Sequence, residues 1–337
     1  MNGRDRFLAH FFDDVPDRLP LFLRDFTLGL DHIGCRTTEL FSDRYDPALS
    51  SRSVSSFGRL TGQDAIVGCV HSPAFIAEQF GGTMRYPEQG IPMVIDHPFS
   101  SPGSLDGADT HLKGKAMDAV ESYHLTRDEC PDMAIVGNIT GPLTKASVLM
   151  GVDVMSMALE TDPDFVRDVI KVGMEATSSF LEMIEGSIDT VFIAAATDNP
   201  SMFGADTMES ISAPILGGMV REIHSMDLPV IYHPHGDYGS KGLMDPVLDT
   251  GIDGFQFAED CNPAVICGLI DDACVVVGGT DIVPTLLSGS EDQIISETER
   301  YIDACSESRY IFSCSCSLQR GTPIENIVTM CRHVIGR

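Results

Sequence analysis

The sequence predicts a (β/α)₈ barrel, an α/β fold that here forms one domain over residues 1–337. Eight short apolar runs have the composition of strands, and they are centred near residues 21, 66, 135, 192, 230, 256, 276 and 311. From residue 133 onward these runs alternate with helical segments without interruption. Continuous apolar strands separated by helices indicate a parallel sheet buried on both faces, and eight of them favour a barrel. An open doubly wound sheet is the alternative, but no glycine-rich phosphate-binding fingerprint follows any run.

The N-terminal part of the chain is less regular than the rest. Residues 4–12 predict a short helix, and the first two strands are expected at residues 21–23 and 65–69. Residues 40–63 are polar and rich in Ser and Arg, and the pattern does not place their helical stretches. Residues 74–81 predict a helix that ends at a Gly-Gly pair.

Residues 83–112 are rich in Gly, Pro, Ser and Asp. This composition predicts a long irregular excursion, and long loops of this kind commonly act as lids or contact substrates. We therefore expect a lid or loop insertion in the N-terminal half of the barrel.

The C-terminal two thirds contain the most regular pattern. Strands are expected at residues 133–137, 190–196, 229–232, 254–258, 274–279 and 309–313, and helices at 161–185, 206–226, 241–250, 263–270, 290–306 and 323–335. The first of these helices begins at Thr161-Asp162-Pro163-Asp164, which supplies a capping side chain, a proline in the first turn and acids at the positive end of the helix dipole.

Composition narrows the class of protein. The net charge is −28 and the pI is near 4.4, which argues against binding to nucleic acids or to anionic membranes. No apolar run approaches the ~20 residues of a membrane span, and no signal peptide is expected at the N-terminus. Ten cysteines follow no regular framework, so free thiols in a reducing cytoplasm are expected rather than disulfides.

Polar side chains appear at the same end of strand after strand. In a barrel the active site lies at the C-terminal ends of the strands. Here those ends carry Arg24, Asp25, Asn138, Asp198, His233, His235, Glu259, Asp281, Cys314 and Cys316. Loops after strands are polar in any protein, so a single residue means little, but the whole set favours an active site at this end.

Two of these strand ends predict a metal site. His233 and His235 are two residues apart, so on a regular strand both imidazoles point to one face. With Cys316 they form a set of two nitrogen donors and one sulfur donor, which favours zinc with an open fourth position. Cys314 competes with Cys316 for this role. The alternative is a pair of histidines that are only hydrogen-bonded in a loop.

Three stretches of the sequence resemble a known family. They are His233-Pro234-His235-Gly236, the run from Asp253-Gly254 to Glu259, and the run from Cys316 through Thr322-Pro323-Ile324-Glu325-Asn326-Ile327. Together they resemble the uroporphyrinogen decarboxylase-like superfamily. The most similar branch is the methylcobamide:coenzyme M methyltransferases and related corrinoid-dependent methyltransferases.

The resemblance implies a (β/α)₈ barrel with zinc at its mouth. It also implies a zinc-bound thiol, such as coenzyme M, that exchanges a methyl group with a corrinoid protein or methylcobalamin. His233 matches the family's histidine ligand, Cys316 its late cysteine, and Glu259 an acid that can occupy the open zinc position. Of the other residues at the strand ends, Asp198 joins Glu259 as a catalytic candidate, and Asn138 and Arg24 are candidates for binding the cofactor.

The sequence departs from this family at one ligand. The family's middle ligand is Cys, and here it is His235, which makes the site less anionic. This favours an alternative in which the enzyme demethylates a methoxy or methylamine compound and passes the methyl group to cob(I)amide. A porphyrinogen decarboxylase is less favoured, because Leu23-Arg24-Asp25 replaces the Met-Arg-Gln-Ala-Gly-Arg stretch of that branch. A barrel that binds metal or a corrinoid partner without turnover is a further alternative.

Overall fold

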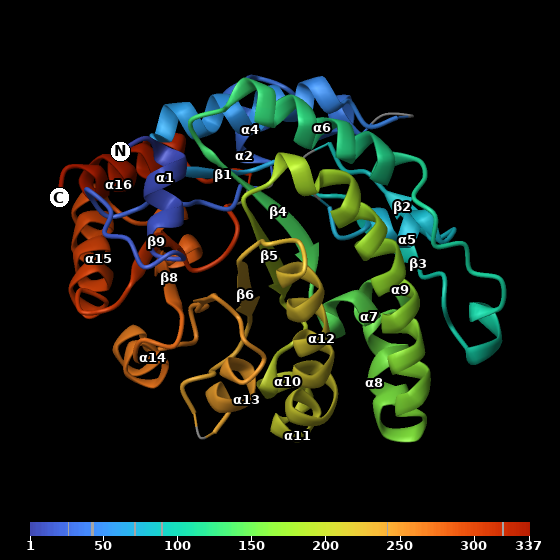
Figure 1. Cartoon of the computed structure of the whole chain (residues 1–337). Coiled ribbons are helices and arrows are strands. Elements are labelled where there is room, and N and C mark those ends of the chain that lie inside the picture. The colour runs from blue at the N-terminus through green and yellow to red at the C-terminus, as the bar shows by residue number, and fades with distance from the viewer. Residues whose placement is uncertain (26, 42–43, 71, 89, 241, 319) are drawn as a thin grey trace.

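A curled parallel sheet of seven strands forms the centre of the protein (Figure 1). The computed structural model describes residues 1–25, 27–41, 44–70, 72–88, 90–240, 242–318 and 320–337. The sheet runs in the order β1 (Ala65–Val67), β4 (Ala134–Thr140), β5 (Thr190–Ala195), β6 (Val230–Pro234), β7 (Gly254–Gln256), β8 (Val275–Thr280) and β9 (Tyr310–Cys314). Every residue of these strands is buried, as expected for a sheet covered on both faces.

The first of the eight predicted strands, at residues 21–23, does not form a strand in the structure, so this prediction is wrong. The segment near residue 21 instead makes two isolated parallel bridges, from Leu21 to Phe312 in β9 and from Phe22 to Ala65 in β1. It lies between the two edge strands, but side chains replace part of the ladder. The Leu21 N–H donates to the Asp64 carboxylate at 2.9 Å, and the Leu23 N–H donates to the Gln63 side chain at 2.8 Å. The sequence pattern shows the apolar run but not this substitution of side-chain acceptors for backbone carbonyls.

Helices cover the outer face of the sheet (Figure 1). They are α1 (Gly3–Ala9), α2 (Leu28–His32), α3 (Thr37–Leu40), α4 (Pro47–Thr61), α5 (Phe75–Gln79), α6 (Lys115–Glu129), α7 (Pro142–Met150), α8 (Val152–Thr161), α9 (Pro163–Ile184), α10 (Pro200–Phe203), α11 (Ala205–Thr207), α12 (Ala213–His224), α13 (Met244–Leu248), α14 (Pro263–Ile270), α15 (Glu291–Ala304) and α16 (Ile324–Ile335). Short helical turns lie at η1 (Pro102–Leu105), η2 (Glu185–Ser187), η3 (Met208–Ser212) and η4 (Ile282–Leu287). Among the described residues no single helix is long and apolar enough to cross a membrane, although the pair α7 and α8, bent by 114°, passes by length and composition.

The long helix α9 begins where the sequence predicts. Asp162 is its N-cap, and the Asp162 side chain accepts the backbone N–H of Phe165. The predicted helix at residues 206–226 is divided between α11, η3 and α12, because a π-helical turn interrupts it. The helix expected at residues 241–250 is observed as α13, and residue 241 lies outside the described part of the chain.

Two polar regions contain more structure than their composition predicts. The Ser- and Arg-rich region holds α4, in which Ser50, Ser53 and Ser55 are buried against the rest of the fold. Its buried face mixes these serines with Leu49, Val54 and Phe57, so the apolar spacing is sparse and the pattern did not place the helix. The excursion at residues 83–112 is not wholly irregular, since β2 (Thr83–Arg85) and β3 (Met93–Asp96) pair antiparallel.

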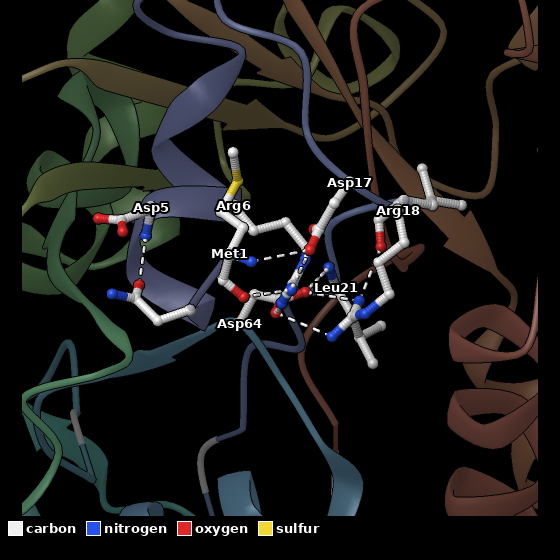
Figure 2. A network of polar contacts seen from close by, with 9 residues as sticks. Met1, Asp5, Arg6, Asp17, Arg18, Leu21 and Asp64 are labelled. Atoms are coloured by element: carbon white, nitrogen blue, oxygen red, sulfur yellow. Dashed lines mark hydrogen bonds and ion pairs between the residues drawn. The ribbon is translucent and has the colours of Figure 1, made fainter.

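Three aspartates join neighbouring strands at their N-terminal ends. Asp64, Asp189 and Asp253 each stand immediately before a strand, and each carboxylate accepts a backbone N–H at the start of the adjacent segment. Asp64 is the most heavily bonded, because the guanidinium groups of Arg6 and Arg18 also donate to it (Figure 2). These contacts fix the N-terminal segment against the base of the sheet and leave the opposite end for the site.

Candidate metal centre

The tips of β6 and β9 bring three metal-ligating side chains together. One donor atom from each of His233, His235 and Cys316 lies within 4.8 Å of the others. The Cys316 Sγ atom is 3.5 Å from Nε2 of His235, and the two imidazole rings are 5.0 Å apart between centroids. The sequence pattern therefore predicted the proximity of three residues that are separated by up to 83 positions.

The backbone after β6 sets the direction of the second histidine. His233 pairs with Ala194 and Pro234 with Ala195 at the end of the ladder, so the strand stops directly before His235. Gly236 then adopts φ +88°, where a Cβ would lie 2.5 Å from the Asn199 side chain. Only glycine suits this turn, because it combines a left-handed backbone with close packing. The turn leaves His235 at the mouth of the sheet beside His233.

A hydrogen bond fixes the orientation of His233. Its Nδ1 lies 3.1 Å from the backbone carbonyl of Gln256, and a carbonyl can only accept, so Nδ1 carries the proton. Burial lowers the pKa of His233, which favours the neutral ring. Nε2 is buried and has no hydrogen-bond partner in the described part of the structure. A neutral imidazole with a carbonyl on one nitrogen and an open lone pair on the other is typical of a metal ligand.

The surroundings of Cys316 favour its thiolate form. Burial raises the pKa of the Cys316 thiol. The contacts with His233 and His235 and the charge of Arg24 lower it by more, so the net pKa is well below the ordinary value. For His235, burial lowers the pKa, whereas Cys316 and then Glu259 raise it, and the net direction is upward. The cluster thus supplies one anionic sulfur and two imidazoles.

This donor set fits zinc. A tetrahedral zinc ion with two nitrogen ligands and one sulfur ligand separates its donor atoms by about 3.3–3.8 Å. The 3.5 Å separation of Cys316 Sγ and His235 Nε2 falls in this range. Imidazole and thiolate are the donors that zinc prefers over the oxygen ligands of calcium or magnesium. Three protein ligands leave a fourth position for a substrate, as in catalytic zinc sites.

The cluster opens into a cavity of about 640 Å³. Its lining comes from the strand ends and from the hairpin of β2 and β3: Arg24, Thr27, Pro73, Arg85, Pro87, Gly90, Ile91, Met93, Thr144, Ala194, Ala195, Ala196, His233, His235, Cys316, Ser317, Leu318 and Arg320. This volume suits a small molecule. The predicted lid region therefore lies at the same cavity as the predicted metal ligands.

Arg24 is the one cofactor-binding candidate that reaches this cavity. It is buried, and its guanidinium lies 4.7 Å from the centre of the Phe192 ring. Burial lowers its pKa to about 10, which still leaves it charged at neutral pH. The neighbouring Asp25 has a structural role instead. Its carboxylate accepts the backbone N–H groups of Leu28 and Gly29 at the start of α2.

Asn138 and Asp198 lie outside the cavity lining. Asn138 is buried on β4, and it lines a separate cavity of about 60 Å³. The carboxylate of Asp198 accepts the backbone N–H groups of Leu143 and Thr144 at the start of α7, and it also bonds the Ser212 hydroxyl. Burial raises the pKa of Asp198 to about 6. These contacts are those of a helix cap.

Glu259 and Cys314 stand near the cluster but outside it. Glu259 is exposed just beyond β7, and its charge acts on His235, although its carboxylate is not among the three clustered donors. Cys314 is fully buried two residues before Cys316, and burial raises its pKa well above the ordinary value. A buried neutral thiol is inert, so the structure favours Cys316 over Cys314 as the sulfur donor.

Three residues of the site were missed from sequence. Gln256 lies within the stretch that resembles the family, and a polar residue inside an otherwise apolar strand was its only signal. Ser317 is buried, lines the cavity, and its hydroxyl has no partner in the described part of the structure. Arg85 comes from the hairpin, whose fold brings it to the cavity from a distant part of the sequence.

Comparison with known proteins identifies the family. The model of the uroporphyrinogen decarboxylase (URO-D) family matches residues 2–336. The chain belongs to this family. The resemblance seen in the motifs of residues 233–327 is therefore confirmed over nearly the whole chain.

The URO-D relatives have more than one activity. Methylcobamide:CoM methyltransferase MtaA of Methanosarcina barkeri is 24% identical over 243 residues, which cover 70% of this chain and 69% of MtaA. A uroporphyrinogen decarboxylase of Wolbachia pipientis wMel is 24% identical over 264 residues, which cover 76% of this chain and 74% of that relative. Membership of the family therefore leaves the reaction to be argued from the site.

A solved structure shares the fold over the full length. A methyltransferase from Methanosarcina mazei superposes with a TM-score of 0.85 at 20% identity, covering 100% of this chain and 99% of that one. A B12-independent methionine synthase from Shewanella sp. W3-18-1 superposes less well, with a TM-score of 0.56 at 12% identity over 85% of this chain and 86% of that one.

Proposed function

We propose that the chain is a zinc-dependent methyltransferase of a corrinoid system, which moves a methyl group between a corrinoid protein and a thiol such as coenzyme M. The observation that carries this proposal is the cluster of His233, His235 and Cys316 in the 640 Å³ cavity. The similar protein MtaA of Methanosarcina barkeri is named as a methylcobamide:CoM methyltransferase, which supports the same assignment. We further propose that residues 20–25 complete a (β/α)₈ barrel and that the hairpin of residues 83–96 acts as its lid.

The charge of the cavity indicates the class of substrate. Arg24, Arg85 and Arg320 line it, and no carboxylate does so among the residues that the structure describes. Arg320 is paired with Asp31, whereas Arg85 forms no ion pair within the described ranges. In a protein of net charge −28, a cavity lined by arginines favours a small anionic substrate over a neutral one. A thiol with an acidic tail meets this requirement.

Zinc bound at this site would lower the pKa of a substrate thiol and present its sulfur as a thiolate. The protein's own residues then position the reactants. Arg24 and Arg85 attract the anionic tail, and the Ser317 hydroxyl offers a hydrogen bond inside the cavity. The methyl group passes to the sulfur as a new C–S bond forms, and the electron pair of the broken Co–C bond stays on the corrinoid. The corrinoid protein docks over the opening, and Glu259, exposed just beyond β7, adds negative charge that acts on His235.

A methylcobalamin assay tests the proposal. We expect the wild-type protein to convert methylcobalamin to cob(I)alamin when coenzyme M or a related anionic thiol is added, with the change followed by absorbance under strictly reducing conditions. The Cys316→Ala variant should show no conversion, and the Cys314→Ala variant should retain it. Absence of conversion with every thiol tested would reject transfer to a thiol.

His235 favours a second candidate of the same class. Two imidazoles and one thiolate carry less negative charge than one imidazole and two thiolates, so the metal is more Lewis acidic and a bound thiolate is less nucleophilic. Such a site suits activation of a methylated substrate, such as a methoxy or methylamine compound, with transfer of the methyl group to cob(I)amide. Incubation of cob(I)alamin with such compounds, followed by the absorbance of methylcobalamin, separates this direction from the first.

A porphyrinogen decarboxylase is the least favoured candidate. Its substrate carries eight carboxylates, and the described cavity offers only Arg24, Arg85 and Arg320 as cations. A cluster of two histidines and a cysteine has no evident role in that reaction. A test with uroporphyrinogen should therefore give no carbon dioxide.

A further inference from the structure

Gln256 connects the two strand ends that carry the metal ligands. Its backbone carbonyl accepts the Nδ1–H of His233 at 3.1 Å. Its side-chain Nε2 donates to the backbone carbonyl of Cys314 at 2.8 Å. Cys314 is the last residue of β9, two positions before Cys316. One residue on β7 thus contacts the histidine on β6 and the strand end that delivers the cysteine.

This connection crosses the inside of the sheet. Gln256 is 1% exposed and ends β7, and β8 separates β7 from β9 in the sheet order. Its amide must therefore reach past β8 to meet the Cys314 carbonyl. The tip of β8 is small at this point, since Gly279 has φ +157° and a Cβ there would lie 2.2 Å from the Ser313 carbonyl oxygen. The crossing is a fixed feature of the buried site and does not depend on a mobile surface side chain.

We propose that Gln256 is a positioning residue that holds the His233 and Cys316 donors at metal-binding separation. The inference rests on the proposed zinc site. Residues that hydrogen-bond to ligands or to their backbone set the ligand geometry, and their loss typically costs about 10–100-fold in metal affinity. Without the amide of Gln256, the β9 tip keeps its pairing with β8 but loses its direct hydrogen bond to β7. The position of the Cys316 thiolate relative to the imidazole of His233 is then less tightly held.

The test compares two buried amides. Gln256→Met conserves length and approximate volume but removes the donor to Cys314. Gln79→Met is the matched control, because Gln79 is also buried and donates to the Thr110 carbonyl, yet it has no contact with the β6 or β9 tips. Zinc affinity is measured by competition with a chromophoric chelator, and ligand geometry by the thiolate-to-cobalt charge-transfer band after substitution with Co²⁺.

We expect Gln256→Met to weaken zinc binding about 10–100-fold and to shift or weaken the cobalt band, while Gln79→Met changes neither. Equal affinity and an unchanged band in Gln256→Met would overturn the inference and leave the proposed function intact. If the wild-type protein itself binds neither zinc nor cobalt, the proposed zinc site is rejected, and with it both the proposed function and this inference. A crystal structure of the zinc-loaded wild type gives a test that does not depend on how the variant folds, since a Gln256 amide turned away from Cys314 would also overturn the inference.

A second and independent feature is a pair of thiols that does not belong to the metal cluster. The Cys267 and Cys305 sulfur atoms are 3.3 Å apart, and they join α14 to the C-cap of α15. Cys267 is partly exposed, whereas Cys305 is buried. The contact with the Cys305 thiol is the main reason that the pKa of Cys267 is lowered to about 7. The same contact raises the pKa of Cys305. A partly exposed thiol of lowered pKa beside a buried thiol is the arrangement of an attacking and a resolving cysteine.

We infer that Cys267 and Cys305 form a disulfide on exposure to low-molecular-weight disulfides. The Cys267 thiolate attacks one sulfur of the reagent and expels a thiolate. Cys305 then attacks Cys267 Sγ and expels the second, so two reagent thiols form and take up the two protons that the cysteines release. Each reagent disulfide is reduced as the pair is oxidised.

Peptide mass spectrometry under non-reducing conditions tests this pairing after treatment with excess 2-hydroxyethyl disulfide. We expect one Cys267–Cys305 cross-link in the wild type and an accumulated mixed disulfide on Cys267 in the Cys305→Ser variant. The Cys267→Ser variant should leave Cys305 unmodified. A wild-type protein whose Cys267 stays as the mixed disulfide, or stays unmodified, would overturn the inference.

Discussion

The sulfur of Cys316 lies 3.5 Å from Nε2 of His235, although 81 residues separate them in the sequence. This contact places a thiolate and an imidazole from two strand ends at the spacing that one metal ion requires. It also distinguishes Cys316 from Cys314, which is buried out of reach and keeps a raised pKa. The chemistry of the cavity therefore depends on which cysteine of the Cys-x-Cys pair faces His235.

Asp64 should be a major determinant of stability. Its side chain is 1% exposed and accepts from Arg6, Arg18 and the Leu21 N–H (Figure 2). Removing one partner of a buried ionic network costs about 3–5 kcal/mol, so Asp64→Ala should lower the free energy of unfolding by that amount in urea denaturation. Asp17→Ala removes a more exposed partner of the same Arg6 and should have a much smaller effect. Equal losses in both variants would contradict this role.

Lys145 should make stability rise with pH above neutrality. It is fully buried, donates to the hydroxyls of Thr140 and Thr177, and burial lowers its pKa to about 7. An unfolded lysine has a pKa of about 10.4, so between pH 7 and 10 the unfolded chain binds a proton that the folded chain has released. The free energy of unfolding therefore increases over that window, by on the order of a few kcal/mol.

Urea denaturation at pH 6.5, 8 and 9.5 checks this effect of Lys145. The free energy of unfolding of the wild type, relative to that of Lys145→Met, should increase as the pH rises. Asp198 has the opposite effect at lower pH. Its pKa is raised to about 6, so the free energy of unfolding decreases as the pH rises from about 4 to about 6. A difference that stays constant across the three pH values would contradict the depressed pKa of Lys145.

Arg85 should affect substrate binding but not metal binding. It reaches the cavity from β2 and lies among residues that line it together with the metal ligands. Arg85→Ala should raise KM for an anionic thiol by about tenfold, as expected for loss of one charge-assisted contact, with zinc content unchanged. A neutral thiol of similar size is the control, and its KM should not move. A similar rise in KM for both thiols would show that the hairpin shapes the cavity without reading the charge.

His235→Cys should retain zinc while changing reactivity. The variant supplies one imidazole and two thiolates, a more anionic set that makes a bound thiol more nucleophilic. We expect faster methyl transfer from methylcobalamin to coenzyme M if the wild type runs in the thiol-methylating direction. If the wild type is a demethylase, the same change should slow the transfer of methyl groups to cob(I)alamin. Unchanged rates in both directions would show that the second histidine does not select the reaction.

The sequence predicted which strand ends bring His233, His235 and Cys316 together, but it did not predict all of the fold around them. His233 lies at the end of one apolar run and Cys316 just after another, and the two side chains meet because the C-terminal ends of parallel strands lie at the same edge of the sheet. The segment at residues 21–23 looked like a strand, yet Asp64 and Gln63 satisfy two of its N–H groups with side chains. Such long-range acceptors leave no signal in the local pattern.

The missed residues have the same explanation. Gln256 acts through a contact 58 residues away, and Arg85 reaches the cavity only because β2 and β3 pair. Asp198 was predicted from its place after a strand, but its contacts are those of a cap for α7. Position at a strand end identifies a candidate, whereas its partners decide between capping and chemistry.

The zinc content of protein purified without chelators tests the central claim most directly. We expect about one equivalent of zinc in the wild type and in Cys314→Ala, and almost none in Cys316→Ala or His233→Ala. Cys314 lies two residues before Cys316 but outside the cavity lining, so Cys314→Ala is the control for loss of a thiol at this strand end. A wild type without zinc, or zinc retained in Cys316→Ala, would contradict a metal centre at this site.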